Sequence, residues 1–262
     1  MLGIVNVTPN SFSDGGRFLD SASAIDHGLR LREEGADIVD VGGESTRPGA
    51  EAVALEEELR RVIPVVEALS REGVAVSVDT MKPEVMRAAI DAGCVVVNDV
   101  NAFRAPGAIE AVAGAEVNLV VMHMQGTPET MQREPHYDDV AAEVGGYLRE
   151  RARALEAAGV DSERIALDPG FGFGKTLAHN VALFRALPVL VGMGYAVLVG
   201  VSRKRLIGDL TGRPLTERTA GSVAAALLAA QNGARLLRVH DVKETVDAIR
   251  VWAALEFSEN HP

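Results

Sequence analysis

Short, continuously apolar segments alternate with longer amphipathic segments along this chain, and the alternation repeats eight times. Most of the short segments are apolar at nearly every position, as in VVVNDV, VNLVVMH and YAVLVGV. Parallel strands that are covered on both faces have this pattern. The pattern therefore predicts eight strands, at residues 2–7, 37–41, 74–79, 95–99, 117–122, 164–168, 195–200 and 235–239.

The longer segments have helical periodicity, and several of them end in a glycine shortly before the next strand. Glycine is the usual residue just after the end of a helix, because it adopts the left-handed conformation without strain. The clearest helices are expected at residues 21–34, 55–71, 84–92, 140–158 and 217–232. The glycines that follow helices are Gly35, Gly73, Gly93, Gly159 and Gly233.

Eight strand–helix units in 262 residues predict an α/β protein with one TIM (β/α)8 barrel as its single domain. The domain is expected to span residues 1–262, with residues 258–262 as a frayed tail. A doubly wound sheet is the alternative fold for alternating strands and helices. The count of eight favours the barrel, and no glycine-rich dinucleotide fingerprint follows the first strand.

Composition and charge narrow the class of function. The net charge of −11 argues against a protein that nucleic acid or an anionic membrane holds by its overall field. No segment approaches the roughly 18 apolar residues of a membrane span, and the first residues lack the pattern of a signal peptide. The single cysteine, Cys94, opens an apolar run and is expected to be buried and inert. We therefore expect a cytoplasmic protein in a reducing compartment.

Polar side chains gather at or just beyond the ends of the predicted strands. In TIM barrels the active site is built at the carboxyl ends of the strands. Each polar residue alone could simply cap a helix or satisfy a loop, but their convergence on one mouth predicts an enzyme. The residues are Asn6, Asp40, Asp79, Asn98, Asp99, His123, Asp168, Ser202, Lys204 and His240.

Three glycine-rich loops follow the first, second and sixth strands, at residues 8–16, 42–49 and 168–175. They carry isolated aromatic or arginine side chains, which is typical of loops that cover a ligand. The segment GFGFGKT is similar to a phosphate-binding P-loop, but Gly170 and Gly174 are separated by three residues, one too few. No structural zinc spacing and no hydrolase elbow are present in the sequence.

Eight segments resemble those of dihydropteroate synthases, in that family's order, from Gly3 to about Val246. They are GIVNVTPNSFSDGG, DVGGESTRPGA, SVDT, VNDV, VVMHMQGTP, LDPGFGFGK, VGVSRKRLIG and RVHDV. The resemblance implies condensation of 6-hydroxymethyl-7,8-dihydropterin diphosphate with 4-aminobenzoate, to give 7,8-dihydropteroate and diphosphate in folate biosynthesis. It also implies a homodimer, formed through outer helices late in the chain.

By the same resemblance, Asp79, Lys204 and Asp168 are the catalytic residues. The pterin ring presents a row of N–H donors, and a carboxylate can accept two of them at once. The family pattern gives this part to Asp168, supported by the Asn98 amide. Asp79 faces the ring and stabilises the cationic methylene that remains after a dissociative C–O cleavage. The full set expected at the pterin is Asp79, Asn98, Met122, Asp168, Phe173 and Lys204.

The resemblance implies two further groups of site residues. The diphosphate is expected at Asn6, Arg47, Arg238 and His240, with Mg²⁺ as the cofactor bound through Asn6. The 4-aminobenzoate is expected at Phe12, Thr46, Pro48, Phe171, Ser202 and Lys204.

Two departures from the family pattern stand out. Asn10 occupies a position where the family usually has Asp, which changes the charge near the expected metal. The sequence also begins almost at the first strand, without the short segment that commonly covers the barrel floor, so the floor is either covered otherwise or more open. A pterin-dependent methyltransferase shares Asp79, Asn98 and Asp168, but has no use for a diphosphate group or for Lys204. An inactive pterin-binding paralogue is expected to lose charged site residues.

Overall fold

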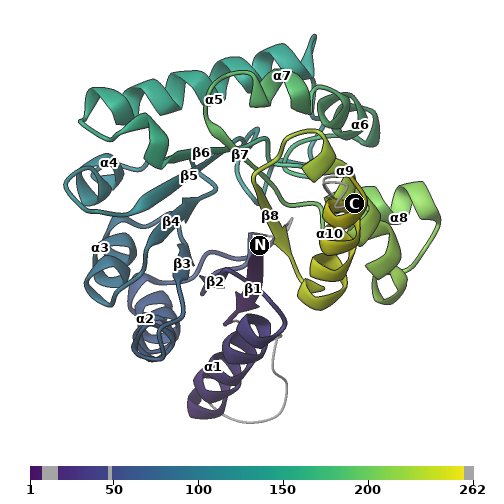
Figure 1. The fold of residues 1–262 in the computed structure, drawn as a ribbon. Helices are drawn as coiled ribbons and strands as arrows, with labels where there is room; N and C mark the ends of the chain where they lie inside the picture. Colours follow the sequence, from purple (N-terminus) through teal and green to yellow (C-terminus); the bar gives the residue numbers. More distant parts are fainter. Residues whose placement is uncertain (8–16, 47–48, 257–262) are drawn as a thin grey trace, which may run out of the picture.

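The computed structural model describes residues 1–7, 17–46 and 49–256, with side chains described from residue 21 in the second range. Eight parallel strands form a closed barrel in chain order, as expected (Figure 1). Leu2 pairs with Ile38 on one side and with Arg238 on the other, which closes the ring. The strands are β1 (Leu2–Asn6), β2 (Ile38–Gly42), β3 (Val76–Asp79), β4 (Val96–Asp99), β5 (Asn118–Met122), β6 (Ile165–Asp168), β7 (Ala196–Val199) and β8 (Leu236–Val239).

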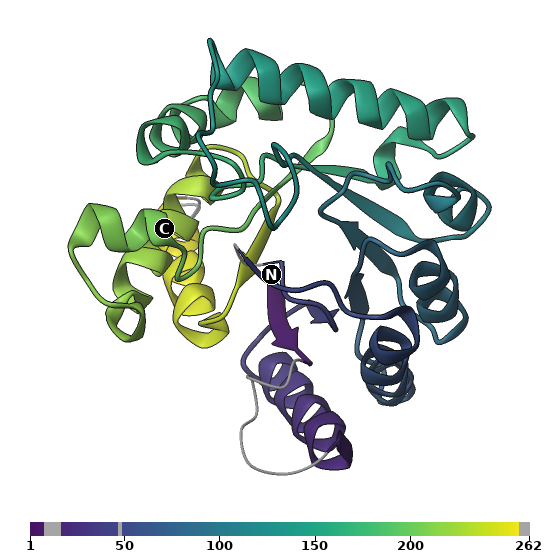
Figure 2. The same ribbon diagram turned by 180° about the vertical axis from the view of Figure 1, so that it is seen from behind.

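Helices surround the barrel on its outside, and the view from behind shows the same arrangement (Figure 2). The predicted helices are present within a few residues of their expected ends. The helices are α1 (Arg17–Glu33), α2 (Leu55–Arg71), α3 (Pro83–Asp91), α4 (Ala108–Val112), α5 (Val140–Ala157), α6 (Leu177–Arg185), α7 (Leu187–Val191), α8 (Arg205–Thr211), α9 (Thr219–Gln231) and α10 (Val242–Glu256). Two short 3-10 helices, η1 (Ser162–Arg164) and η2 (Leu215–Glu217), precede β6 and α9.

The apolar residues form an outer core, an inner core and a smaller cluster that contains Met122. The outer and inner cores are separate because successive side chains of a strand point to opposite faces. On β5, Leu119 and Val121 pack outward against the helices, whereas Val120 points into the barrel. The inner core consists of Leu2, Val96, Val120, Ala166 and Leu198. These side chains fill the lower part of the barrel, so its floor is a packed apolar layer.

The same alternation decides what the mouth of the barrel contains. On β4, β5 and β6, the inward position two residues beyond the inner core is a polar residue or a methionine: Asn98 follows Val96, Met122 follows Val120, and Asp168 follows Ala166. The register then brings these positions together, since Asp79 pairs with Asn98 and Met122 with Asp168. The fold therefore concentrates the polar strand ends above an apolar plug.

Candidate active site

A half-buried arginine links three strands at the mouth. Arg238 Nε donates to Asp40 Oδ2 at 2.6 Å, and its Nη2 donates to Asp79 Oδ2 at 2.9 Å. Asp40 is fully buried, and its other oxygen has no hydrogen-bond partner among the described residues. Burial raises the pKa of Asp79 to about 7, although the charge of Arg238 opposes this shift. The pKa of Arg238 is raised by the two carboxylates, so this residue stays charged.

Asp168 closes β6 with its carboxylate inside the mouth and only 4% of its surface exposed. Its Oδ1 accepts a hydrogen bond from the Gly170 N–H at 2.7 Å. Burial raises the pKa of Asp168, and the nearby Lys204 ammonium opposes that shift most strongly. Asn98 is also buried, and its Oδ1 has no partner among the residues that the structure describes. Buried polar atoms nearly always have a hydrogen-bond partner. Acceptors left open, as on Asp168 and Asn98, are therefore typical of a site where a ligand supplies the missing donors.

Lys204 lies beyond β7 and reaches back over the loop that follows β6. Its Nζ donates to the Phe171 carbonyl oxygen at 2.7 Å and lies 4.6 Å from the centre of the Phe173 ring. An ammonium has three N–H donors, so this contact leaves capacity for further partners. Burial lowers the pKa of Lys204 to about 8, against the favourable charge of Asp168.

The Phe171 ring lies in the outer core of the barrel. It is fully buried and packs against Phe184, with ring centres 5.7 Å apart. The Phe171 carbonyl oxygen accepts the Lys204 hydrogen bond. The expected contact between the Phe171 ring and 4-aminobenzoate stays a prediction, and the ring would have to leave the outer core to make it. The glycines on either side, Gly170 and Gly172, have positive φ values that turn the chain out of strand alternation.

Phe173 instead lies beside the mouth, packed against a cluster that contains Met122. Beyond β7 and β8, Ser202 Oγ lies 3.1 Å from both the backbone nitrogen and Nδ1 of His240. Asn6 and Thr46 are half-buried at the ends of β1 and β2. The residues Phe12, Arg47 and Pro48, as well as Asn10, lie outside the described residues.

The described residues contain no group of three or more His, Cys, Asp or Glu side chains arranged to hold a metal ion. The fold leaves the Asn6 amide at the end of β1, half-buried and without a side-chain hydrogen bond to another described residue. An amide oxygen is a suitable ligand for a hard cation, and Mg²⁺ commonly takes its other ligands from substrate phosphates and water. The donor set fits a metal that arrives with a phosphorylated substrate.

Three buried polar residues at the mouth were given no specific role from the sequence. Asp40 was noted only as a polar strand residue, yet it is the first partner of Arg238. His123 and Lys175 lie behind Asp168, and their side chains are 3.0 Å apart. Two features of the sequence could have pointed to these residues. Asp40 is a carboxylate within an otherwise apolar strand, and Lys175 closes a loop rich in glycine.

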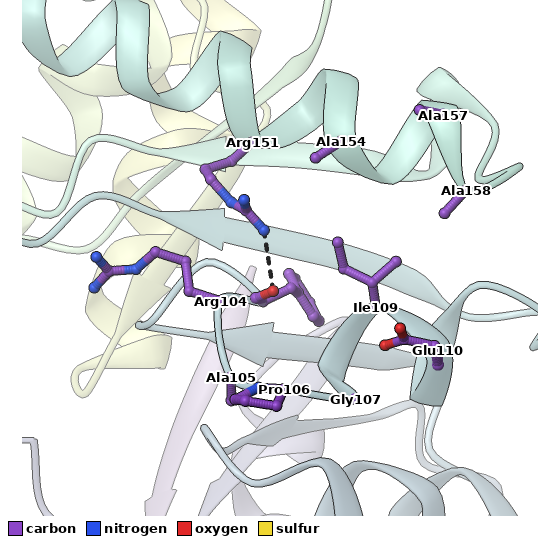
Figure 3. Close-up of a pocket in the computed structure, with 11 residues that line it drawn as sticks. Arg104, Ala105, Pro106, Gly107, Ile109, Glu110, Arg151, Ala154, Ala157 and Ala158 are labelled. Carbon is purple, nitrogen blue, oxygen red and sulfur yellow. Dashed lines mark hydrogen bonds between the residues drawn. The ribbon is translucent and has the colours of Figure 1, made fainter.

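A cavity of about 500 Å³ opens on the outside of the barrel, between the loop after β4 and α5 (Figure 3). Its walls include Ile109 and Ala154, with Arg104 and Glu110 at its edges. Arg151 points into the loop beneath and donates to the Phe103 carbonyl oxygen at 3.0 Å. None of the predicted site residues lines this cavity, so the chemistry belongs to the mouth.

The chain is similar to known proteins over nearly its whole length. The sequence profile of the family described as "Pterin binding enzyme" matches residues 2–240. The dihydropteroate synthase of Escherichia coli (strain K12) is 51% identical over 262 residues, covering 99% of this chain and 93% of its own. A solved structure of Xanthomonas albilineans dihydropteroate synthase with 4-aminobenzoic acid is 58% identical, with a TM-score of 0.92, covering 100% of this chain and 93% of that chain. The same enzyme in complex with 7,8-dihydropteroate is 56% identical, with a TM-score of 0.89, covering 100% and 94%.

The barrel, its polar mouth and the profile match together define the class: the chain belongs to the pterin-binding enzymes. A half-buried cationic rim of Arg238 and Lys204 lies beside the buried acceptors Asp168 and Asn98. Within that class, identities above 50% over nearly the whole chain place it among the dihydropteroate synthases.

The Arg238 bridge predicts a specific loss of stability. We expect Arg238→Met to lower the free energy of unfolding by about 3–5 kcal/mol at pH 7.5, because two carboxylates lose their buried cation. Burial already raises the pKa of Asp79 to about 7 against the charge of Arg238, so without Arg238 this carboxylate protonates more readily and its penalty is relieved as the pH falls. The loss should therefore be smaller at pH 5.5 than at pH 7.5. Urea unfolding at both pH values measures it.

Arg235→Met is the matched control, because Arg235 is exposed just before β8. It should change the free energy of unfolding by no more than about 0.5 kcal/mol. An Arg238→Met protein as stable as the control at pH 7.5 would contradict the role given to the bridge.

Proposed function

We propose that this protein condenses 6-hydroxymethyl-7,8-dihydropterin diphosphate with 4-aminobenzoate, releasing 7,8-dihydropteroate and diphosphate. The observation that carries the proposal is the pairing of buried, incompletely bonded acceptors with adjacent cations at one mouth. Asp168 and Asn98 match the N–H donors of a pterin ring, whereas Arg238 and Lys204 match the charged ends of the two substrates.

In the proposed pterin pocket, Asp168 Oδ1 is already engaged by the Gly170 N–H. This hydrogen bond orients the carboxylate so that Oδ2 can accept from the ring. Asn98 offers the unpaired Oδ1 as a second acceptor, and its NH₂ as a donor. Met122 and Phe173, which belong to one apolar cluster, would pack against the flat ring.

Cleavage of the C–O bond sends its electron pair to the departing diphosphate and leaves a cationic methylene on the pterin. Arg238 and His240 lie beside Asp79 and Ser202, where they can bind the diphosphate, together with Arg47. Asp79 is held by Arg238 close to the position of the methylene and would stabilise its positive charge. The amine of 4-aminobenzoate then forms the C–N bond and loses a proton, so no protein nucleophile is needed.

We propose Mg²⁺ as the cofactor, held by Asn6 together with the diphosphate. The ion would neutralise charge on the leaving group as the C–O bond breaks. Asn6 ends β1 next to Gly42 of β2, so its amide lies at the rim rather than in the apolar interior.

The second substrate has a carboxylate, which we assign to Lys204 and Ser202, with Thr46 close by. Lys204 keeps unused N–H donors beyond its bond to Phe171, and its ammonium already lies over the Phe173 ring. In this proposal Lys204 would lie between the pterin ring and the ring of 4-aminobenzoate. Phe12 and Pro48 are assigned to the 4-aminobenzoate ring from the resemblance alone.

We also propose a homodimer formed through the late helices. Several large apolar side chains are exposed on consecutive elements: Leu210 on α8, Leu215 on η2, Leu228 on α9, and Val251 and Leu255 on α10. Exposed apolar surface of this kind marks interaction sites when it is contiguous.

No helix of the described residues is long and apolar enough to cross a membrane. The lone cysteine supports placing the reaction in the cytoplasm.

The function is tested by incubating the purified protein with pterin diphosphate, 4-aminobenzoate and Mg²⁺, and measuring released diphosphate and 7,8-dihydropteroate. We expect both products in equal amounts, and a loss of turnover when EDTA removes the metal, restored by added Mg²⁺. A methyltransferase or an inactive pterin-binding protein would release no diphosphate. Full turnover in EDTA would contradict the metal assignment only.

Asp168 and Lys204 are expected to fail in different ways. Asp168→Asn keeps the acceptor for Gly170 but removes the charge, and should weaken pterin diphosphate binding by about 30-fold or more. Lys204→Ala should lower kcat/KM for 4-aminobenzoate roughly ten- to a hundredfold, with a smaller effect on pterin diphosphate binding. Calorimetry and steady-state kinetics with both substrates varied measure these effects.

Arg205→Ala is the control for Lys204, since it is the next cation along the chain and is exposed on α8. It should behave as the wild type. Wild-type kinetics in Lys204→Ala would show that this lysine does not bind 4-aminobenzoate. Wild-type pterin diphosphate affinity in Asp168→Asn would show that Asp168 does not bind the pterin ring.

The proposed dimer predicts that a charge in place of one of these exposed apolar side chains disrupts association. Leu228 is half-exposed on α9, so Leu228→Glu should leave the fold intact and shift sedimentation toward a monomer. Val189→Glu on α7 provides a comparison, because Val189 is more exposed but belongs to another helix. A wild type that sediments as a monomer at micromolar concentration would rule the proposal out.

A further inference from the structure

Lys175 is a buried lysine to which neither the motifs nor the proposed chemistry gives a role. It closes the loop between β6 and α6, and only 4% of its surface is exposed. A buried ammonium is costly unless all of its donors are satisfied. The groups that satisfy Lys175 therefore indicate why a lysine stands there.

All three N–H donors of Lys175 have acceptors within the protein. Its Nζ lies 2.9 Å from the Gly170 carbonyl oxygen, 3.0 Å from that of Phe173 and 3.0 Å from His123 Nδ1. Because an ammonium has three donors, this set is complete. Lys175 has no donor left for a substrate, in contrast to Lys204.

Two of the three residues that accept from Lys175 also hold Asp168. The His123 backbone N–H donates to the Asp168 carbonyl oxygen at 3.0 Å, and the Gly170 N–H donates to the Asp168 carboxylate at 2.7 Å. Lys175 thus connects the residue that holds the Asp168 backbone to the residue that holds its side chain. The third acceptor, the Phe173 carbonyl, belongs to the residue whose ring lies beside the mouth.

The two loops are also packed too closely for this arrangement to vary freely. A Cβ atom on Gly170 would lie 1.9 Å from the His123 carbonyl oxygen, and one on Gly174 would lie 2.8 Å from the Gln125 side chain. Gly174 also accepts a hydrogen bond from the Tyr137 hydroxyl at 2.9 Å. The loops after β5 and β6 therefore form one unit, with the Lys175–His123 pair at its centre.

We propose that Lys175, paired with His123, is a positioning residue that fixes the Asp168 carboxylate and the 170–173 loop for pterin recognition without touching the substrate. The inference rests on the proposed function, because it takes Asp168 as the reader of the pterin ring. In precise binding sites, residues behind the binding side chains hold them in place through hydrogen bonds. Lys175 would have this role for Asp168.

The pair also fixes the tautomer of His123. A charged Lys175 can only donate, so Nδ1 must accept and the single ring proton must lie on Nε2. Burial and the neighbouring Lys175 lower the pKa of His123 to about 3, which keeps the ring neutral. Burial lowers the pKa of Lys175 to about 7, and the charge of Asp168 opposes that shift.

The test uses the full chain with Lys175→Met, His123→Asn, His123→Leu and the control Lys243→Met, whose lysine is exposed on α10. Calorimetry measures binding of 6-hydroxymethyl-7,8-dihydropterin diphosphate. We expect Lys175→Met and His123→Leu to weaken binding by about tenfold or more, because each leaves buried polar groups unpaired. His123→Asn retains an acceptor near the Nδ1 position and should stay within about threefold of wild type. Lys243→Met should bind as the wild type does.

Nitrogen NMR of the wild type adds a readout that does not depend on substrate or on the folding of a variant. At pH 6, below the pKa of about 7 of Lys175, we expect the His123 ring to be neutral, with its proton on Nε2 and a bare Nδ1. A proton on Nδ1 overturns the inference, as does unchanged pterin binding in a folded Lys175→Met protein. Equal losses in His123→Asn and His123→Leu also count against it. A wild type that binds no pterin diphosphate would instead overturn the proposed function, while the NMR result would still decide the Lys175–His123 pair.

Discussion

The guanidinium of Arg238 is the interaction on which the interior of this barrel depends. It is the shared partner of Asp40 and Asp79, whose strands lie on the far side of β1 from β8. Without a cation, two carboxylates this deeply buried would have to protonate or bring in water. In the proposed mechanism, Arg238 would therefore do more than offer a charge to the diphosphate. It would also allow Asp79 to remain ionised close to the cationic methylene.

The bridge works because the barrel divides its interior into two layers of opposite character. The lower layer, with Leu2, Val120 and Leu198, is dry and closely packed, so it provides a rigid base of low dielectric. The polar layer lies directly on that base, and charges above it interact more strongly than they would in water. The upward pKa shift of Asp168 and the downward shift of Lys204 both have burial as their main cause. In the proposed function, the burial that disfavours the charged forms of Asp168 and Lys204 would also favour a charged, flat substrate that pairs with them.

Strand periodicity was enough to predict the polar strand ends, but it does not describe the loops beyond them. Asp79, Asn98 and Asp168 were found because a parallel strand must point alternate residues inward, and its carboxyl end must meet its neighbours. The contact of Phe171 with 4-aminobenzoate was expected from the resemblance alone. Glycines with positive φ on either side of Phe171 set the direction of its ring, and no pattern of apolar residues encodes that direction. The pairing of Arg238 with Asp40 joins residues 198 positions apart, so it was visible only once the barrel had closed.

The three cations around Asp168 differ in how many of their donors the protein already uses, and this difference separates support from recognition. Lys175 has three protein acceptors and is nearly inaccessible, so its charge acts on Asp168 only from behind. Lys204 has one, and its ammonium lies beside an aromatic ring at the open side. Arg238 is intermediate, with two carboxylates holding a group that has five donors. If the protein used every N–H donor of the neighbouring cations, the carboxylate would only be part of a structural ion pair. If it used none of them, nothing would fix the orientation of the carboxylate. Asp168 has both kinds of neighbour, which is what a buried group needs if it is to be held still and yet remain available to a ligand.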